Sequence, residues 1–437
     1  MDIHFSYRLW QRLSLAGLSV VVLMVSEFSS ASSELINASS DARVEHPHEE
    51  HPHLKVDKDL SVADIFAAAF ARAPENAMTA SYASQAESQQ RVSRNWLADR
   101  PRFNVNYWDD QFVNDTGLLE MEAGIEMDLW RRGQRQNAKQ LALQYEKGKN
   151  AWDDYFRLIV TGRVRETLHQ IAMSSLEANH AGKRLGDVEQ LLVISEKRYS
   201  AGEIAYAEHI QAENLKIEVA QKLLESQAEM VDAERQYTML TGLYARPENL
   251  TESIPSTSDI STEHPQLRFL MARQQQQFSK LEQQRQQAAG NTTVALRIRR
   301  EQGSRLEPEI ESLGLSVTIP FGSSSVASAA VAEGSESLAN LDMQLQHARL
   351  SLQRQLHEVQ HDLDVLENAI RLATTGVELS RQRWNMAERA FELGESDIRP
   401  TILALQEYRD SELHLQQLQL RRSARISSFK QIVGELL

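Results

Sequence analysis

Two very long stretches without proline constrain the fold of this chain most. No proline lies between Arg102 and Arg246, and none lies between Phe321 and Arg399. Both stretches are rich in Ala, Leu, Gln, Glu, Lys and Arg, which favour helix. We therefore predict a helix over residues 134–199, about 100 Å long at 1.5 Å per residue, and a second over residues 338–391. Ordinary globular domains contain much shorter helices.

Each long helix is followed by the same kind of turn. The glycines of the two turns, Gly202 and Gly394, are 192 residues apart, and Gly242 and Gly434 repeat that interval. Glycine readily takes the left-handed conformation that ends a helix. The sequence therefore predicts two repeats, residues 60–242 and 264–437, joined by a linker at 243–263. Each repeat contains a helical hairpin.

Short amphipathic strands precede each hairpin. Apolar Leu313, Leu315 and Val317 alternate with small or polar residues, which is typical of a strand with one apolar face. A similar stretch around Gly124 alternates apolar residues with Glu120, Glu122, Glu126 and Asp128. We predict strands within about 102–130 and 292–321. The preceding helix of the first repeat should run to about Asp99, and residues 323–337, mostly Ser, Ala and Gly, should be flexible.

The N-terminus resembles a secretory signal. Arg8 and Arg12 precede an apolar run over residues 13–25, which small residues follow. We predict a cleaved signal at 1–31. The run is short for a membrane-spanning helix, although an uncleaved anchor is the alternative. No later stretch is apolar enough to span a bilayer as a helix, so any spanning segments should be strands.

A histidine-rich segment follows the signal. Residues 32–59 are polar and are predicted to be disordered. This segment contains four histidines that could capture a metal ion weakly through imidazole nitrogens, or could simply be a solvated tail. They are His46, His48, His51 and His53.

Composition excludes several classes of protein. The formal net charge is −14, which argues against a nucleic-acid groove. There is no Cys, so disulfides, thiolate metal sites and a cysteine nucleophile are excluded. His357, Glu358 and His361 spell a zinc-peptidase motif, but they lie in a long charged helix without a third ligand or a cleft. We therefore predict neither an enzyme nor a cofactor.

The fold class that satisfies these patterns is mainly α with a small transmembrane β part. Four strands cannot close a barrel, whereas three copies of the chain would supply twelve strands. The helical hairpins would then form a tunnel below the barrel. Met121, Ile125 and their neighbours would face lipid. The acidic side chains would face the lumen, namely Glu120, Glu122, Glu126 and Asp128.

Residues 60–437 resemble the TolC-type outer-membrane efflux channels. The resemblance rests on the duplicated strands and turns. Three strings are similar to the CzcC-like heavy-metal branch, namely residues 122–135, 316–322 and 393–395. The resemblance implies a homotrimer in the outer membrane of a Gram-negative bacterium, with a large periplasmic part. The trimer would passively conduct heavy-metal cations from a periplasmic adaptor and an inner-membrane proton-driven pump of the RND type.

The resemblance also implies two sites. Acidic residues narrow the periplasmic aperture of many relatives. Here Glu208 lies six residues after Gly202, but Pro400 lies six after Gly394, so Asp397 is the nearest acid in the second repeat. The adaptor would dock at the two hairpin turns, formed by Ala201, Gly202, Glu203 and Ile204 and by Leu393, Gly394, Glu395 and Ser396.

Two other functions are compatible with the same sequence. The first is a channel for organic compounds, which the histidine segment and the metal-branch strings disfavour. The second is a periplasmic coiled-coil adaptor or scaffold. An adaptor needs modules with many short strands, and it would not need amphipathic strands in duplicate.

Overall fold

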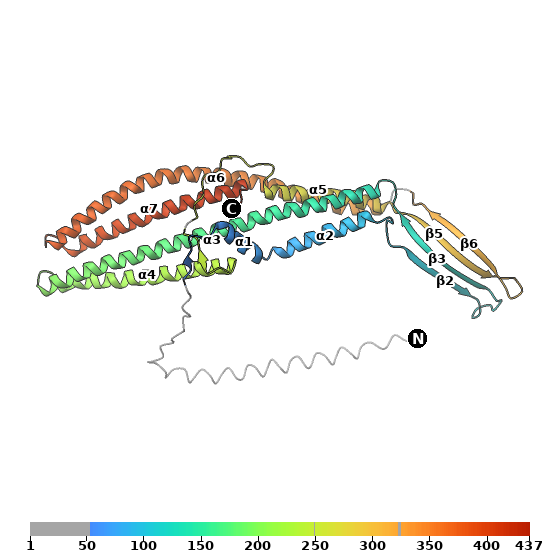
Figure 1. Cartoon of the computed structure of the whole chain (residues 1–437), viewed down its shortest axis with the longest axis horizontal. Helices are drawn as coiled ribbons and strands as arrows, with labels where there is room; N and C mark the ends of the chain where they lie inside the picture. The colour runs from blue at the N-terminus through green and yellow to red at the C-terminus, as the bar shows by residue number, and fades with distance from the viewer. Residues whose placement is uncertain (1–52, 249, 322–324) are drawn as a thin grey trace, which may run out of the picture. The chain divides into compact units, whose positions relative to one another are not determined.

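A computed structural model describes residues 53–248, 250–321 and 325–437. The chain divides into two units, Met1–Pro52 and His53–Leu437, and only the second is described. The predicted signal at 1–31, together with His46, His48 and His51, lies outside the described residues. The described unit contains two long helical hairpins and, beyond one end of the helices, a sheet (Figure 1).

Residues 60–242, predicted as the first repeat, contain α1 (Val62–Arg72), α2 (Asn76–Arg94), α3 (Gln134–Ser200) and α4 (Tyr206–Thr241). Residues 264–437, predicted as the second repeat, contain α5 (Pro265–Ala288), α6 (Ser325–Glu392) and α7 (Ile398–Val433). The two longest helices, α3 and α6, have 67 and 68 residues. Ser61 caps α1 through a reciprocal hydrogen-bond pair with Asp64, which fixes where helix begins.

The boundaries of two predicted helices were wrong. Helix α2 ends at Arg94 rather than near Asp99, because strand pairing begins there. Leu97 forms a β-bridge with Leu129, and the Ala98 amide donates to the Asp128 carbonyl. Helix α6 begins at Ser325, so the segment predicted to be flexible is helical from that residue. Alanine favours helix, and the start of α6 packs on α5, where Gln277 donates to the Gly334 carbonyl.

The segment predicted to be disordered is partly ordered. Strand β1 (Lys55–Val56) pairs in parallel with β4 (Ala245–Arg246) in the linker. The adjacent Leu54 is buried. A buried side chain and two paired strands hold residues 54–56 against the helices, which their polar sequence context did not indicate.

The main sheet combines both repeats. Its strands are β2 (Arg102–Asp109), β3 (Leu119–Leu129), β5 (Thr292–Gln302) and β6 (Ile310–Thr318), in the order β2-β3-β5-β6 and all antiparallel. Gly124 and Gly314, equivalent in the two repeats, both pair with Arg297. A Cβ on Gly124 would lie 2.6 Å from Cγ of Arg297, so glycine makes room for the arginine.

The helices repeat this four-element order at two levels. Next to the sheet, packing contacts join neighbours in the order α2-α3-α5-α6. Towards the hairpin turns they join α4-α3-α7-α6, and α4 hardly touches α7. Each level therefore has two outer elements with one free side (Figure 1). These are β2 and β6 in the sheet, α2 and α6 beside it, and α4 and α6 towards the turns.

The core lies where α1, α3 and α4 meet. Ile65, Phe156 and Tyr237 are fully buried there, and the Tyr237 hydroxyl donates to the Ala245 carbonyl at 2.8 Å. Beside this core, the buried pair Arg165–Glu252 joins α3 to the linker at 2.8 Å. Arg165 also donates to the Glu435 carbonyl, so one side chain holds the linker and the C-terminus on α3. Among the described helices, none has a stretch long and apolar enough to cross a lipid bilayer.

Candidate functional site

The main sheet has one apolar and one ionic face. On the apolar face the register aligns Phe103, Ile125, Leu296 and Leu315 across all four strands. All four side chains of this row are exposed, Leu315 to 71%. Leu313, the next residue of β6 on the same face, is also 71% exposed. Within the described residues nothing covers this face. A contiguous exposed apolar surface marks contact with a partner or with lipid.

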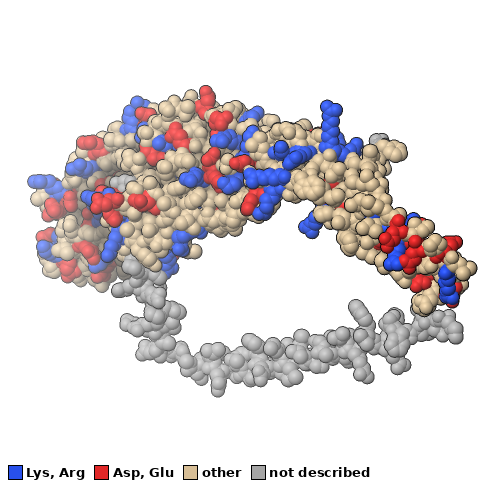
Figure 2. Space-filling model, turned by 45° about the vertical axis from the view of Figure 1, so that its right-hand side comes forward, with Lys and Arg blue, Asp and Glu red and all other residues tan. Residues whose placement is uncertain are grey.

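The opposite face carries the four acidic residues that the sequence predicts for a lumen. Each has an arginine partner. Arg297 lies 2.6 Å from Glu126, Arg299 lies 2.7 Å from Glu120, and Arg102 lies 3.0 Å from Asp128. Glu122 lies 3.5 Å from Arg297. The face is therefore a network of alternating charges rather than a bare acidic surface, and both signs appear on the sheet in Figure 2.

Sequence reasoning missed the arginines of this network. Arg297 and Arg299 alternate with Val294, Leu296 and Ile298, so their shared face was visible in the sequence. The pairing itself depends on the register between β3 and β5, whose partners Glu126 and Arg297 are 171 residues apart. No local pattern reports such a register.

The two hairpin turns lie together at the end of the helices far from the sheet. Gly202 and Gly394 have φ values of +78° and +75°, as the sequence predicts for left-handed turns. Arg198, at the end of α3, donates to the Phe391 carbonyl at 3.0 Å, and its guanidinium lies 4.7 Å from the centre of the Phe391 ring. One cation thus joins the two turns that were predicted to dock an adaptor.

The predicted docking residues are accessible. Ala201, Gly202 and Glu203 are exposed, as are Leu393, Gly394 and Glu395, whereas Ile204 and Ser396 are half-buried. Arg198 also donates to Glu203 and to the Ser396 carbonyl, but the buried side chains that hold the turns are different ones. Phe391 and Ile398 are fully buried under the second turn. The exposed residues are therefore free to contact a partner without disturbing the packing of the hairpins.

The predicted aperture residues both lie near the start of a return helix, but at different positions. Glu208 lies in the first turn of α4, and Asp397 is the residue just before α7. Within the described residues no hydrogen bond or ion pair joins them. One carboxylate oxygen of Glu208 is buried without a hydrogen-bond partner. Within one chain the two acids therefore do not form a bonded pair.

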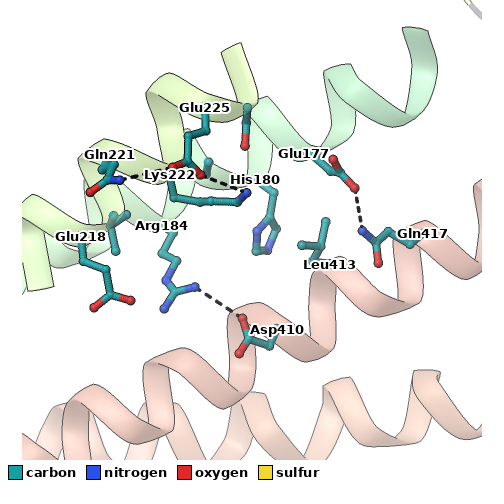
Figure 3. Close-up of a pocket in the computed structure, with 13 residues that line it drawn as sticks. Glu177, His180, Arg184, Glu218, Gln221, Lys222, Glu225, Asp410, Leu413 and Gln417 are labelled. Carbon is teal, nitrogen blue, oxygen red and sulfur yellow. Dashed lines mark hydrogen bonds and ion pairs between the residues drawn. The ribbon is translucent and has the colours of Figure 1, made fainter. Parts of the chain in front are cut away.

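A polar groove of about 540 Å³ lies between α3, α4 and α7 (Figure 3). Arg184 and Asp410 form an ion pair across it at 3.5 Å, and Gln417 donates to Glu177. His180 is 5% exposed, and its Nε2 atom has no hydrogen-bond partner. Burial lowers the pKa of His180, and the nearby Arg409 adds to this, while Glu412 opposes it. The histidine is therefore held neutral inside the groove.

No metal site is formed within the part of the chain that the structure describes. Among residues 53–248, 250–321 and 325–437, no group of three or more His, Asp or Glu side chains is arranged to hold an ion. His53 lies 3.1 Å from Glu234, but among the described residues no third His, Asp or Glu joins this pair to form a metal site. His357 and His361 of the peptidase-like motif are exposed on α6.

Comparisons with known proteins identify the fold. No protein-family model and no curated protein sequence matches the chain. Solved structures match closely. The outer membrane protein VceC of Vibrio cholerae superposes with a TM-score of 0.70 at 13% identity, covering 85% of this chain and 96% of VceC.

Two further channels give similar values. CusC has a TM-score of 0.66 at 14% identity, covering 85% of this chain and 92% of CusC. The CmeC outer membrane channel of Campylobacter jejuni has 0.65 at 13%, covering 85% of each chain. The chain therefore has the fold of the TolC-type channels, mainly α with long helical hairpins and four strands in one sheet, as the sequence predicts.

Proposed function

We propose that the chain is the outer-membrane channel of a tripartite efflux system and works as a ring of three copies. The observation that carries this proposal is the repeated four-element order with two free edges at every level of the molecule. An unpaired strand edge cannot face hydrocarbon, because each unsatisfied backbone group there costs several kcal/mol. Joining β6 of one copy to β2 of the next removes every edge and gives a barrel of twelve strands.

The two faces of the sheet support this arrangement. In a closed barrel the exposed apolar row of Phe103, Ile125, Leu296 and Leu315 would contact lipid. The ionic face would line water, where charged side chains stay solvated. The paired charges leave the lumen with both signs, so the barrel itself would pass ions and small molecules with little selection.

The helical edges support the same ring. α6 exposes Val365, Leu372, Leu379 and Met386, and Leu393 follows just past its end, with exposed fractions between 52% and 75%. These residues are seven apart, which is the spacing of a coiled-coil seam. On α4, Ile217 and Leu224 are also seven apart and about two-thirds exposed. We propose that the α6 seam of one copy packs on α4 of its neighbour.

The remaining partners are proposed from the resemblance to tripartite efflux channels. A periplasmic adaptor would contact the exposed hairpin turns around Gly202 and Gly394, and an inner-membrane RND pump would supply the energy. Glu208 and Asp397 of three copies would surround the periplasmic aperture. The channel would be a passive conduit, without a catalytic step or a cofactor.

We propose heavy-metal cations as the exported species. The support is the histidine-rich segment, whose last member His53 contacts Glu234 at 3.1 Å, together with the strings that resemble the metal branch. The segment would capture metal ions weakly near the channel. Export of organic compounds is the alternative, and the mixed charges of the ionic face suit it equally well.

An adaptor or scaffold is disfavoured by the arrangement of strands. The described residues contain one four-stranded and one two-stranded sheet, and no compact barrel module of short strands. The exposed apolar face of the larger sheet also has no role in a soluble scaffold.

The proposal is tested by cross-linking the sheet edges in the membrane. The chain has no Cys, so Asn104→Cys on β2 can be combined with Ser312→Cys or Ser316→Cys on β6. Within one copy these edges are about 14 Å apart, three strand spacings, which no disulfide spans. We expect covalent dimers and trimers in the outer-membrane fraction for a double variant, and none for the single variants. A soluble periplasmic monomer would refute the channel.

The exported species needs a separate test. A strain that lacks the gene should become sensitive to zinc, cobalt or cadmium salts, while its sensitivity to organic dyes and detergents stays unchanged. The opposite pattern would assign the channel to organic compounds and leave the ring intact.

A further inference from the structure

We infer that the groove between α2 and α3 next to the sheet binds the anionic phosphate headgroup of a membrane lipid. This inference rests on the proposed function, because it requires the sheet to lie in a bilayer. The groove has a volume of about 610 Å³. Arg94, Arg135 and Lys139 line the end nearest the sheet, and exposed Leu143 lies beside them.

The three cations have no acidic partner. Within the described residues, no ion pair or side-chain hydrogen bond is formed by Arg94, Arg135 or Lys139. The other charged residues of the groove lie further from the sheet. Glu87 pairs with Arg91, and Lys149 pairs with Asp153. Glu146 is seven residues beyond Lys139, about 10 Å along the helix. The sheet end of the groove is therefore positive, although the whole chain is acidic.

This positive charge belongs to a wider collar. Residues 94–100 and 131–139 together contain six Lys or Arg and one acid, Asp99. Figure 2 shows basic side chains gathered where the helices approach the sheet. Such a concentration is not a requirement of the fold, because the second repeat lacks it. α6 has no Lys or Arg before Arg349, and Arg285 on α5 pairs with Glu282.

The depth of the groove matches a headgroup. Arg94 is the last residue of α2, and Arg135 is the second residue of α3, six residues after β3 ends. Lys139 lies one helical turn beyond, about 6 Å further. Each interfacial region of a bilayer is about 5–8 Å thick. The cations would therefore lie at headgroup level when the apolar face of the sheet lies in hydrocarbon, and Leu143 would contact lipid beside them.

Spin-labelled lipids test the inference on the full-length trimer. The protein is reconstituted in phosphatidylcholine, and the immobilised fractions of spin-labelled phosphatidylglycerol and phosphatidylcholine are compared. Each cation near a membrane surface strengthens anionic lipid binding about fivefold. We expect a preference for phosphatidylglycerol of about fivefold or more in the wild type. It should fall close to one in the triple variant Arg94→Gln, Arg135→Gln, Lys139→Gln.

A matched control removes the same charge elsewhere. The control is the triple variant Lys147→Gln, Lys183→Gln, Arg381→Gln. These three residues are exposed and lie further from the sheet, so the variant should keep the preference for phosphatidylglycerol. Equal preferences in both triple variants would overturn the inference. A competition experiment could also overturn the inference. If inorganic phosphate abolished the lipid preference and chloride of equal ionic strength did not, the groove would bind a soluble anion instead of a lipid.

The same samples separate this inference from the proposed function. Unheated gels report whether each variant forms an inserted trimer. A wild type that does not insert refutes both the channel and the lipid site. An inserted wild-type trimer without lipid preference refutes only the lipid site.

Discussion

Arg409 on α7 is the principal ionic link between the two hairpins. Its guanidinium lies 2.5 Å from Asp187 on α3 and 2.7 Å from Glu412. Burial opposes the charged form, but the hydrogen bonds to Asp187 and Glu412 outweigh it and raise the pKa of Arg409. The link therefore stays charged at any physiological pH.

We expect Arg409→Met to destabilise the protein by about 1–3 kcal/mol, since it leaves two partly buried carboxylates without their partner. Thermal unfolding of the trimer measures this. Arg383→Met is the matched control, because its pair with Glu407 is exposed and such pairs contribute about 0–1 kcal/mol. An equal loss of stability in both variants would show that the Arg409 link contributes no more than an exposed ion pair.

His180 makes stability depend on pH. Its pKa in the folded protein lies below its usual 6.5, mainly through burial, with Arg409 and Lys183 adding to this and Glu412 opposing it. The unfolded chain therefore binds a proton more readily than the folded protein does. Stability should be complete above pH 6.5 and should fall as pH drops through that value.

We expect the melting temperature of the wild type to fall between pH 7.5 and 5.5 by more than that of His180→Gln. The difference corresponds to at most about 1.4 kcal/mol per pH unit. His414→Gln, which removes an exposed histidine of α7, should behave like the wild type. The remaining slope in His180→Gln should come from His169 and His264, whose pKa values are also lowered by burial.

At the scale of elements, the need for glycine at position 202 of the first hairpin turn comes from backbone conformation rather than from packing. Gly202 has a φ of +78°, and a Cβ there would meet no atom within 4 Å. Any cost of a side chain therefore comes from the left-handed backbone alone. Gly186 is the useful comparison, because it lies inside α3 and its Cβ would also meet nothing.

We expect Gly202→Ala to destabilise the first hairpin by about 1–2 kcal/mol. Gly186→Ala should stabilise it by about 0.5–1 kcal/mol, since alanine is the better helix former. Hydrogen exchange of the amides around each position can resolve both effects. A neutral Gly202→Ala would mean that the turn relaxes into another conformation, and adaptor binding should then change.

At the scale of the whole molecule, the free edges decide assembly. Leu379 lies in the middle of the exposed seam of α6, whereas Thr374 is exposed on the same helix two residues beyond the seam position Leu372. A glutamate adds one negative charge at either place. Only at Leu379 would that charge be enclosed between two copies.

We expect Leu379→Glu to reduce the trimer at least about tenfold, because burying an unpaired charge costs several kcal/mol. Thr374→Glu should assemble normally. Cross-linking followed by an unheated gel gives the trimer fraction. Normal trimers in Leu379→Glu would place the interface on another face of α6.

Local sequence patterns determined much of this architecture. Proline-free runs of helix-forming residues predicted α3 and α6, and alternation predicted the strands and the side of β3 that carries Glu120 and Glu126. The repeat of Gly202 and Gly394 predicted both turns. These features depend on neighbouring residues, because helix and strand periods decide which side chains share a face.

Only the tertiary structure decided what each face meets. The start of α6 is helical because it packs on α5, and α2 ends early because Leu97 pairs with Leu129. Arg198 joins turns that are almost 200 residues apart, and the acidic row of β3 meets arginines of β5. Strand register and helix contacts bring together segments that are distant in the chain. The hydrophobic periodicity of one segment therefore does not reveal which distant segment it pairs with.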